Sequence, residues 1–153
     1  MHQRLVDLCG QKRLRPQDLL DVDEAELRAV GLSGAKMAAL KDLAAKTLDG
    51  TVPTLARLRK MDDEQIIEHL TQVRGIGRWT VEMLLMFRLG RPDVLPVGDY
   101  AVRKGYAKIN GLAEMPRPKE LVRLCEIWRP YRTVGSWYMW RSLDLPQYSS
   151  NGK

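Results

Sequence analysis

The chain has 153 residues, 44% of them hydrophobic, which is enough apolar material for the core of a single domain. Its apolar runs are too short to cross a membrane, no signal-peptide pattern is present, and its two cysteines cannot form a disulfide framework or a four-cysteine iron–sulfur cluster. The net charge is +6, and the whole excess falls in residues 70–153, with 14 Lys/Arg and 7 Asp/Glu, against 11 and 12 in residues 1–69. Such an excess attracts polyanions, although a solvated surface without a partner accounts for it equally well.

Helical periodicity dominates the sequence and alternating β-branched runs are scarce, so the pattern predicts an all-α fold of short helices and tight turns. In chain order, the expected helices span residues 2–10, 16–20, 24–30, 34–48, 63–70, 78–89, 100–110, 116–128 and 131–142, and residues 55–58 are expected to form a brief turn. The segment 94–97 is expected to be extended. We predict one helical domain over residues 1–145 and a flexible tail over residues 146–153.

Residues with the chemistry of helix caps stand at the predicted boundaries. Asp23, Ser33 and Asp62 each precede a helical segment and can accept a hydrogen bond from its first backbone N–H groups. Gly31 follows one helix, and Pro118 stands near the first turn of another. The cap chemistry therefore agrees with the helical periodicity.

The segment 70–83 reads LTQVRGIGRWTVEM and joins two predicted helices through a Gly-x-Gly turn. Gly75 and Gly77 can adopt positive φ and let a phosphate approach, and the positive end of the following helix dipole attracts an anion. Arg74 and Arg78 flank the turn as side-chain contributors. An ordinary helical corner is the alternative, but the preceding Leu-x-x-Val, the following apolar helix and both arginines favour contact with a DNA backbone.

Asp99 stands in the segment PVGDYAVRKGY, at the point where the next helix is expected to begin. Its carboxylate can cap that helix by accepting a backbone N–H. A carboxylate held rigidly at a helix end also suits a group that stabilises a positively charged sugar or activates a water at C1′. The two roles are compatible, so Asp99 is the candidate catalytic residue.

Four segments together resemble the helix-hairpin-helix (HhH-GPD) DNA glycosylase superfamily, and in particular its bacterial 3-methyladenine DNA glycosylase II branch. They are ELRAVGLS at 26–33 with Lys36, VRGIGRWT at 73–80, DVLPVGD at 93–99, and WRPYR at 128–132 followed by WRSL at 140–143. They occur in the family's order and at about its spacing, over nearly the whole chain. The resemblance implies a helix-hairpin-helix glycosylase fold and excision of alkylated bases.

The resemblance also implies roles for individual residues. Asp99 corresponds to the essential aspartate, and Trp79, Met83 and Trp140 correspond to the base pocket. Contact with the DNA backbone is implied for Arg74, Gly75, Ile76, Gly77, Arg78 and Thr80. In relatives, backbone carbonyls that correspond to Thr71, Val73 and Ile76 hold a monovalent cation, so we expect Na⁺ or K⁺ at the hairpin and no required cofactor.

Trp79 indicates the subclass. Glycosylases that also cleave the sugar–phosphate chain carry a lysine at this position, and tryptophan offers no amine for a Schiff base. The resemblance therefore implies a monofunctional enzyme with water as the nucleophile. The indole faces of Trp79 and Trp140 suit a cationic alkylated base, with core packing as the alternative for both. Met83 stands where some relatives place an aromatic residue.

Relatives begin with further helices, including a loop that fills the gap left by a flipped base. We therefore expect the first residues to expose an apolar surface, which self-association or a partner chain would cover. The predicted function is hydrolysis of the N-glycosidic bond of alkylated purines (3-methyladenine type) in double-stranded DNA, which leaves an abasic site. We expect the protein in the cytoplasm, associated with the nucleoid, and we expect no membrane partner. The alternatives are a non-catalytic or truncated helix-hairpin-helix DNA-binding module and a purely structural helical domain.

Overall fold

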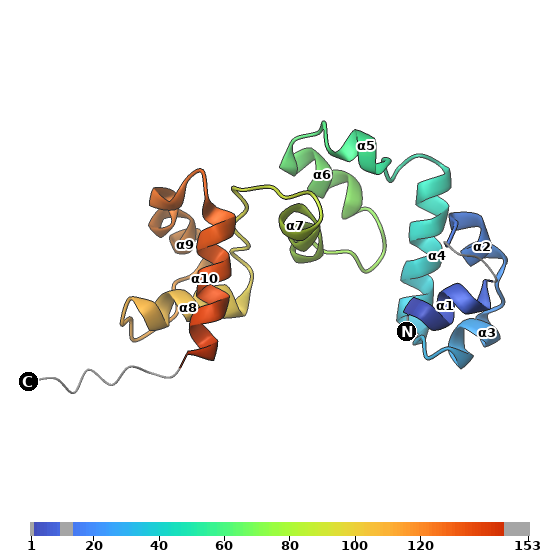
Figure 1. The fold of residues 1–153 in the computed structure, drawn as a ribbon, viewed down its shortest axis with the longest axis horizontal. Coiled ribbons are helices and arrows are strands. Elements are labelled where there is room, and N and C mark those ends of the chain that lie inside the picture. The colour runs from blue at the N-terminus through green and yellow to red at the C-terminus, as the bar shows by residue number, and fades with distance from the viewer. Residues whose placement is uncertain (1, 10–13, 146–153) are drawn as a thin grey trace, which may run out of the picture. The chain divides into compact units, whose positions relative to one another are not determined.

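The computed structural model describes residues 2–9 and 14–145, and the predicted flexible tail lies outside the described residues. Every regular element in this part of the chain is a helix, which confirms the all-α prediction (Figure 1). None of the described helices is long and apolar enough to cross a membrane. The chain forms two compact units, Met1–Val81 and Glu82–Lys153, and each is described by itself.

The first unit is built on its longest helix, α4. Its helices are α1 (His2–Leu8), α2 (Pro16–Asp21), α3 (Glu24–Ala29), α4 (Gly34–Leu48), α5 (Leu55–Leu58) and α6 (Asp63–Leu70), followed by the start of α7 (Arg78–Phe87). Both α2 and α3 pack against α4, as Figure 1 shows. The buried core of these helices consists of Leu5, Leu19, Leu27, Leu32, Met37 and Ala44. This core makes α4 the frame of the first unit.

The residues predicted as caps, Asp23, Ser33 and Asp62, occupy the N-cap positions of helices in this unit. Asp62 caps α6, because its Oδ1 accepts the Gln65 N–H at 2.8 Å and the Gln65 side chain accepts the Asp62 N–H at 3.3 Å. Ser33 occupies the N-cap position of α4 without a capping hydrogen bond from its side chain. Gly31 has a φ of +95°, which glycine adopts without strain after the end of α3.

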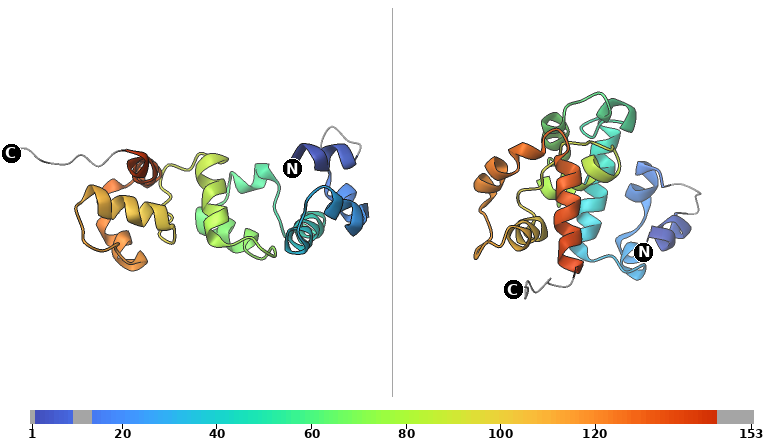
Figure 2. Two further views of the ribbon diagram at one scale, coloured as in Figure 1. Left: turned by 90° about the horizontal axis from the view of Figure 1, so that it is seen from below. Right: turned by 60° about the vertical axis from the view of Figure 1, so that its left-hand side comes forward.

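The second unit gathers three helices around one core (Figure 2). After the rest of α7 come α8 (Tyr100–Ile109), α9 (Pro118–Leu124), the 3₁₀ turn η1 (Glu126–Trp128) and α10 (Arg132–Asp144). The buried residues of this core are Leu95, Val102, Tyr106, Leu121, Cys125 and Met139. Leu95, in the loop before α8, therefore packs in the same core as residues of α8, α9 and α10, and this packing fixes the loop.

Helices α8 and α10 approach each other closely. At Gly105, in the middle of α8, an added Cβ would collide with the Met139 carbonyl oxygen and lie 2.9 Å from the Ser142 Oγ. Near the end of α8, the Lys108 ammonium donates to the Ser142 and Leu145 carbonyls at 2.6 and 2.7 Å. A lysine in this position satisfies carbonyls at the C-terminal end of α10. Gly105 and Lys108 together determine how α8 and α10 pack.

Two of the helix boundaries that differ from the sequence prediction have a clear local cause. The expected helix 116–128 is divided, because α9 ends at Leu124 and the chain tightens into η1 ahead of Pro130, which cannot continue an α-helix. The expected helix 78–89 ends at Phe87. There the Leu89 N–H turns back to the Leu84 carbonyl, and Gly90 takes a φ of +68°.

We predict that Gly105→Ala destabilises the second unit, because the new methyl group would force α8 and α10 apart. The free energy of unfolding should fall by roughly 1–3 kcal/mol, the usual cost of overpacking, as measured by urea denaturation. Gly34→Ala is the matched control, since an added Cβ at the start of α4 meets nothing within 4 Å. Equal stability of the two variants would contradict the close packing.

Candidate active site

Asp99 is the N-cap residue of α8, as the sequence predicted. Its Oδ1 accepts a hydrogen bond from the Val102 backbone N–H at 2.9 Å. The chain reaches this position through a tight turn, in which the Asp99 N–H donates to the Pro96 carbonyl at 2.9 Å. The residue is only 8% exposed, so its carboxylate is held at the helix end with little conformational freedom.

A second donor reaches the same carboxylate oxygen from α10. The indole Nε1–H of Trp140 donates to Asp99 Oδ1 at 3.1 Å. Phe87, the last residue of α7, stacks on the Trp140 ring with the ring centroids 6.0 Å and the planes 28° apart. The candidate catalytic residue therefore lies at the edge of an aromatic pair, Phe87 and Trp140, within the second unit.

Sequence reasoning did not identify Phe87 as a site residue, although a signal was present. It is the only phenylalanine in the chain and follows Met83 by four residues, a spacing that puts both on one side of a helix. Phe87 is 65% exposed, whereas Met83 is half-buried. An exposed aromatic ring stacked on a predicted pocket residue belongs with that pocket.

The segment that leads to Asp99 is fixed to the start of α10. Asp93 Oδ1 accepts from Arg132 Nε at 2.7 Å, and its Oδ2 accepts from Arg129 Nη1 at 2.6 Å. The Thr133 hydroxyl donates to the Arg91 carbonyl at 2.7 Å and accepts the Val94 N–H at 3.0 Å. These bonds join the loop before Asp99 to the helix that carries Trp140.

The Gly-x-Gly turn lies between α6 and α7 in the first unit. Gly75 has a φ of +77°, as predicted, and the Ile76 N–H closes the turn onto the Val73 carbonyl at 3.0 Å. Gly77 does not use this conformational freedom, because its φ lies outside the left-handed region. One left-handed residue is enough to reverse the chain here, and Gly77 lies directly before α7, with its carbonyl accepting the Val81 N–H at 3.2 Å.

The two arginines beside this turn make contacts within the first unit. Arg78 forms a bidentate ion pair with Glu64 of α6, with Nη2–Oε1 and Nη1–Oε2 distances of 2.5 and 3.0 Å. Both side chains are more than half exposed, so a phosphate can compete with the carboxylate for the guanidinium. The backbone N–H of Arg74 donates to Asp42 Oδ2 at 2.7 Å. The turn is thus anchored to α4 and α6.

The remaining predicted contact residues lie on the first turn of α7. Trp79 is 52% exposed, and Thr80 is exposed as well. Both belong to the first unit, whereas Asp99 and Trp140 belong to the second. The structure brings Asp99 and Trp140 into direct contact, and the roles of Trp79 and Thr80 stay predictions.

The carbonyl groups expected to hold a monovalent cation fit such an ion chemically. Thr71 is the C-cap of α6, where the helix dipole is negative, and the Val73 carbonyl lies in the turn that follows. Together with Ile76 they offer neutral oxygen ligands, which suit Na⁺ or K⁺ better than a transition metal. Among the described residues, no group of three His, Cys, Asp or Glu side chains could hold a metal ion.

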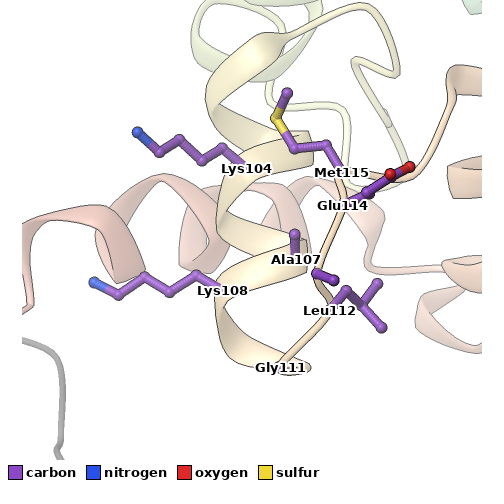
Figure 3. A pocket seen from close by; sticks show the side chains of 8 residues that line it. Lys104, Ala107, Lys108, Gly111, Leu112, Glu114 and Met115 are labelled. Atoms are coloured by element: carbon purple, nitrogen blue, oxygen red, sulfur yellow. The ribbon is translucent and has the colours of Figure 1, made fainter.

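A cavity of about 450 Å³ opens beside the last turns of α8 (Figure 3). It is lined by Lys104, Ala107, Lys108, Gly111, Leu112, Ala113, Glu114 and Met115. Figure 3 shows both lysine side chains extending to one side of α8, away from Leu112 and Met115. None of the predicted site residues lines this cavity, so it is separate from the candidate active site.

Comparison with known proteins identifies the family. Residues 1–130 match the model of the HhH-GPD superfamily of base excision DNA repair proteins. The chain belongs to this superfamily. The family prediction and the helix-hairpin-helix fold class are therefore confirmed.

Several proteins resemble the chain over most of its length. It is 40% identical to DNA-3-methyladenine glycosylase 1 of Schizosaccharomyces pombe over 134 residues, which cover 88% of the chain and 59% of that protein. It is 32% identical to the putative DNA-3-methyladenine glycosylase YfjP of Bacillus subtilis over 148 residues, which cover 93% of the chain and 51% of that protein. The chain thus spans between half and two thirds of the length of these relatives.

Two solved structures are similar to this chain in fold. The S. pombe 3-methyladenine DNA glycosylase in complex with abasic DNA matches with a TM-score of 0.79 at 33% identity, covering 97% of this chain and 82% of that one. A DNA-3-methyladenine glycosidase from Bacillus halodurans matches with a TM-score of 0.82 at 33% identity, covering 92% and 64% of the two chains.

We predict that Asp93→Asn destabilises the protein in a pH-dependent way. The hydrogen bond from Arg132 is the main reason that the pKa of Asp93 is lowered, while burial acts against it. A lowered pKa contributes stability above the unfolded-state value of about 3.9, and this stability is lost as the pH falls through the folded-state pKa. The variant should therefore lose roughly 1–3 kcal/mol near neutral pH and approach the wild type in acid.

The measurement is urea unfolding between about pH 2 and pH 7. Asp144→Asn is the control, because its ion pair with Arg141 is exposed on both sides and contributes little. A difference between wild type and Asp93→Asn that does not shrink in acid would contradict the proposed ion pair.

Proposed function

We propose that the chain is a monofunctional DNA N-glycosylase that removes alkylated purines of the 3-methyladenine type from double-stranded DNA and leaves an abasic site. Membership of the HhH-GPD superfamily and similarity to proteins named DNA-3-methyladenine glycosylase support this proposal. So does similarity to a glycosylase solved in complex with abasic DNA, the product of such a reaction. The observation that carries the proposal is the contact of the buried Asp99 carboxylate with the Trp140 ring.

The reaction requires a group that stabilises positive charge on the sugar and accepts a proton from water, and the Asp99 carboxylate can do both. Breaking the N-glycosidic bond leaves positive charge on the sugar, and a fixed carboxylate nearby stabilises that charge. Once the nucleotide is flipped out of the duplex, a water oxygen bonds to C1′ and its proton passes to the carboxylate. The electron pair of the broken bond leaves with the base, so a positively charged alkylated purine departs as a neutral molecule.

The aromatic pair gives the site a preference for cationic bases. Trp140 uses the edge of its ring to bind Asp99 and one face to stack on Phe87. Electron-rich aromatic faces attract a cation, and a positively charged alkylated purine is flat enough to stack on them. In this proposal Met83, which precedes Phe87 by four residues on α7, belongs to the same pocket.

The hairpin formed by α6, the Gly75–Gly77 turn and α7 binds the DNA backbone in this proposal. Backbone N–H groups at the start of α7 and the positive end of its dipole bind a phosphate, with Arg74, Arg78 and Thr80 close by in the chain. The carbonyls of Thr71, Val73 and Ile76 would hold Na⁺ or K⁺, and a bound cation supplies positive charge next to the phosphate. Backbone contacts of this kind carry no sequence information, which suits an enzyme that meets damage in any sequence.

We predict that Asp99→Asn abolishes base release and leaves DNA binding intact. Asparagine is a good N-cap, so α8 keeps its first turn, but a neutral amide cannot stabilise the sugar cation or accept the water proton. The rate should fall by about 10²–10⁴-fold. The measurement is single-turnover release of 3-methyladenine and 7-methylguanine from a methylated duplex, together with binding to a duplex that carries an abasic-site analogue.

Two outcomes would contradict this assignment. If the wild-type chain binds the abasic duplex and releases neither base, it is a DNA-binding module without catalysis. If Asp99→Asn releases base at the wild-type rate, the chemistry belongs to another residue.

We further predict that Trp140→Phe slows base release. Phenylalanine keeps an aromatic face for stacking and removes the N–H that holds Asp99, so kcat should fall by about tenfold or more while KM changes less. Trp137→Phe is the control, because Trp137 lies on the same helix and its ring packs against Tyr138 and Arg141. Equal rates for the two variants would show that the indole N–H has no part in positioning the carboxylate.

A further inference from the structure

One side of α4 contacts the segment between α6 and α7 that is proposed to bind DNA. Asp42 and Lys46 are four residues apart, which places them on neighbouring turns of the same helix side. Asp42 Oδ2 accepts the backbone N–H of Arg74 at 2.7 Å, and the Lys46 ammonium donates to the backbone carbonyl of Gln72 at 2.5 Å. The two side chains therefore bind main-chain atoms on either side of Val73.

The two anchoring groups also bind each other. Lys46 Nζ donates to Asp42 Oδ2 at 2.8 Å, so one carboxylate oxygen serves both the lysine and the Arg74 N–H. The side chains of Asp42 and Lys46 are 29% and 27% exposed. This partial shielding strengthens the pair relative to a fully exposed one. The hydrogen bonds from Arg74 and Lys46 lower the pKa of Asp42.

The turn itself rests on the same helix. Val73 is only 1% exposed, and an added Cβ on Gly75 would lie 3.3 Å from the Ala39 Cβ of α4. Ala39 is three residues before Asp42, on the same helix side. The path of the backbone from Gln72 to Gly75 is thus set by three consecutive contacts with α4.

We propose that Asp42 and Lys46 are positioning residues for DNA binding, which hold the hairpin backbone in the conformation that receives a phosphate. The inference rests on the proposed function, because it takes the hairpin as the DNA contact. The lysine also neutralises the aspartate, which alone would repel a phosphate bound at the turn. Neither side chain touches DNA in this proposal, since both are occupied by the hairpin backbone.

The test is binding of the full chain to a duplex with a tetrahydrofuran abasic-site analogue, over a range of salt concentrations. Asp42→Ala and Lys46→Met should each weaken binding by about tenfold, as expected for loss of a hydrogen bond to a charged group. The slope of log Kd against log salt should stay unchanged, because a phosphate contact would contribute about 0.9 to it. Amide hydrogen exchange at Arg74 should become faster in Asp42→Ala.

Matched variants keep the test decisive. Lys41→Met removes a lysine from the same helix and should leave both the affinity and the Arg74 exchange rate unchanged. Asp42→Asn, which keeps an oxygen for the Arg74 N–H and weakens the bond to Lys46, should lie between wild type and Asp42→Ala. It replaces Asp42→Ala if the alanine variant does not fold, as judged by thermal unfolding.

Each outcome separates this inference from the proposed function. If the wild-type chain does not bind the abasic duplex, the proposed function fails, and the inference fails with it. If the wild type binds the abasic duplex, and Asp42→Ala and Lys46→Met bind it with the wild-type affinity, the inference alone fails. A slope reduced by about one unit in Lys46→Met would show that Lys46 contacts a phosphate directly, which also overturns the positioning role.

Discussion

The candidate active site depends on one oxygen atom, Asp99 Oδ1. It caps α8 through the Val102 N–H and binds the indole of Trp140 in α10. Because both donors converge on one oxygen, the carboxylate cannot rotate without losing contacts to two helices at once. The close packing of α8 and α10 at Gly105 keeps those donors in place. A group fixed in this way loses little freedom when charge develops beside it, which is the main requirement for electrostatic catalysis.

A similar arrangement occurs in each of the two units. Asp93 joins the loop before Asp99 to Arg132 at the start of α10 and to Arg129 at the end of η1, and Asp42 joins the hairpin backbone to α4. In both places an aspartate with a basic partner fixes an irregular segment to a helix. Such polar bonds satisfy and fix loop backbone groups that no regular element pairs. The contacts of Asp93 and Asp42 thus stabilise the two segments to which the catalytic and DNA-binding roles are assigned.

Local features were predictable from the sequence, whereas contacts between distant residues were not. The caps at Asp62 and Asp99 and the positive φ of Gly75 follow from chemistry within a few residues, and all three are confirmed. The stacking of Phe87 on Trp140 joins residues far apart in the chain and depends on how helices pack. The break after α9 was missed for a local reason, because the helical periodicity continues to Trp128 although Pro130 follows. The catalytic and DNA-binding roles stay predictions, because no sequence pattern shows which groups share a site.

The central claim is that this chain breaks an N-glycosidic bond and leaves the DNA strand intact. The direct measurement is incubation of the wild-type chain with a methylated, end-labelled duplex, followed by analysis of the released bases and of strand length before and after alkali. The account predicts free 3-methyladenine and a full-length strand that alkali cleaves at the abasic site. Release of no base, or strand cleavage without alkali, would contradict it.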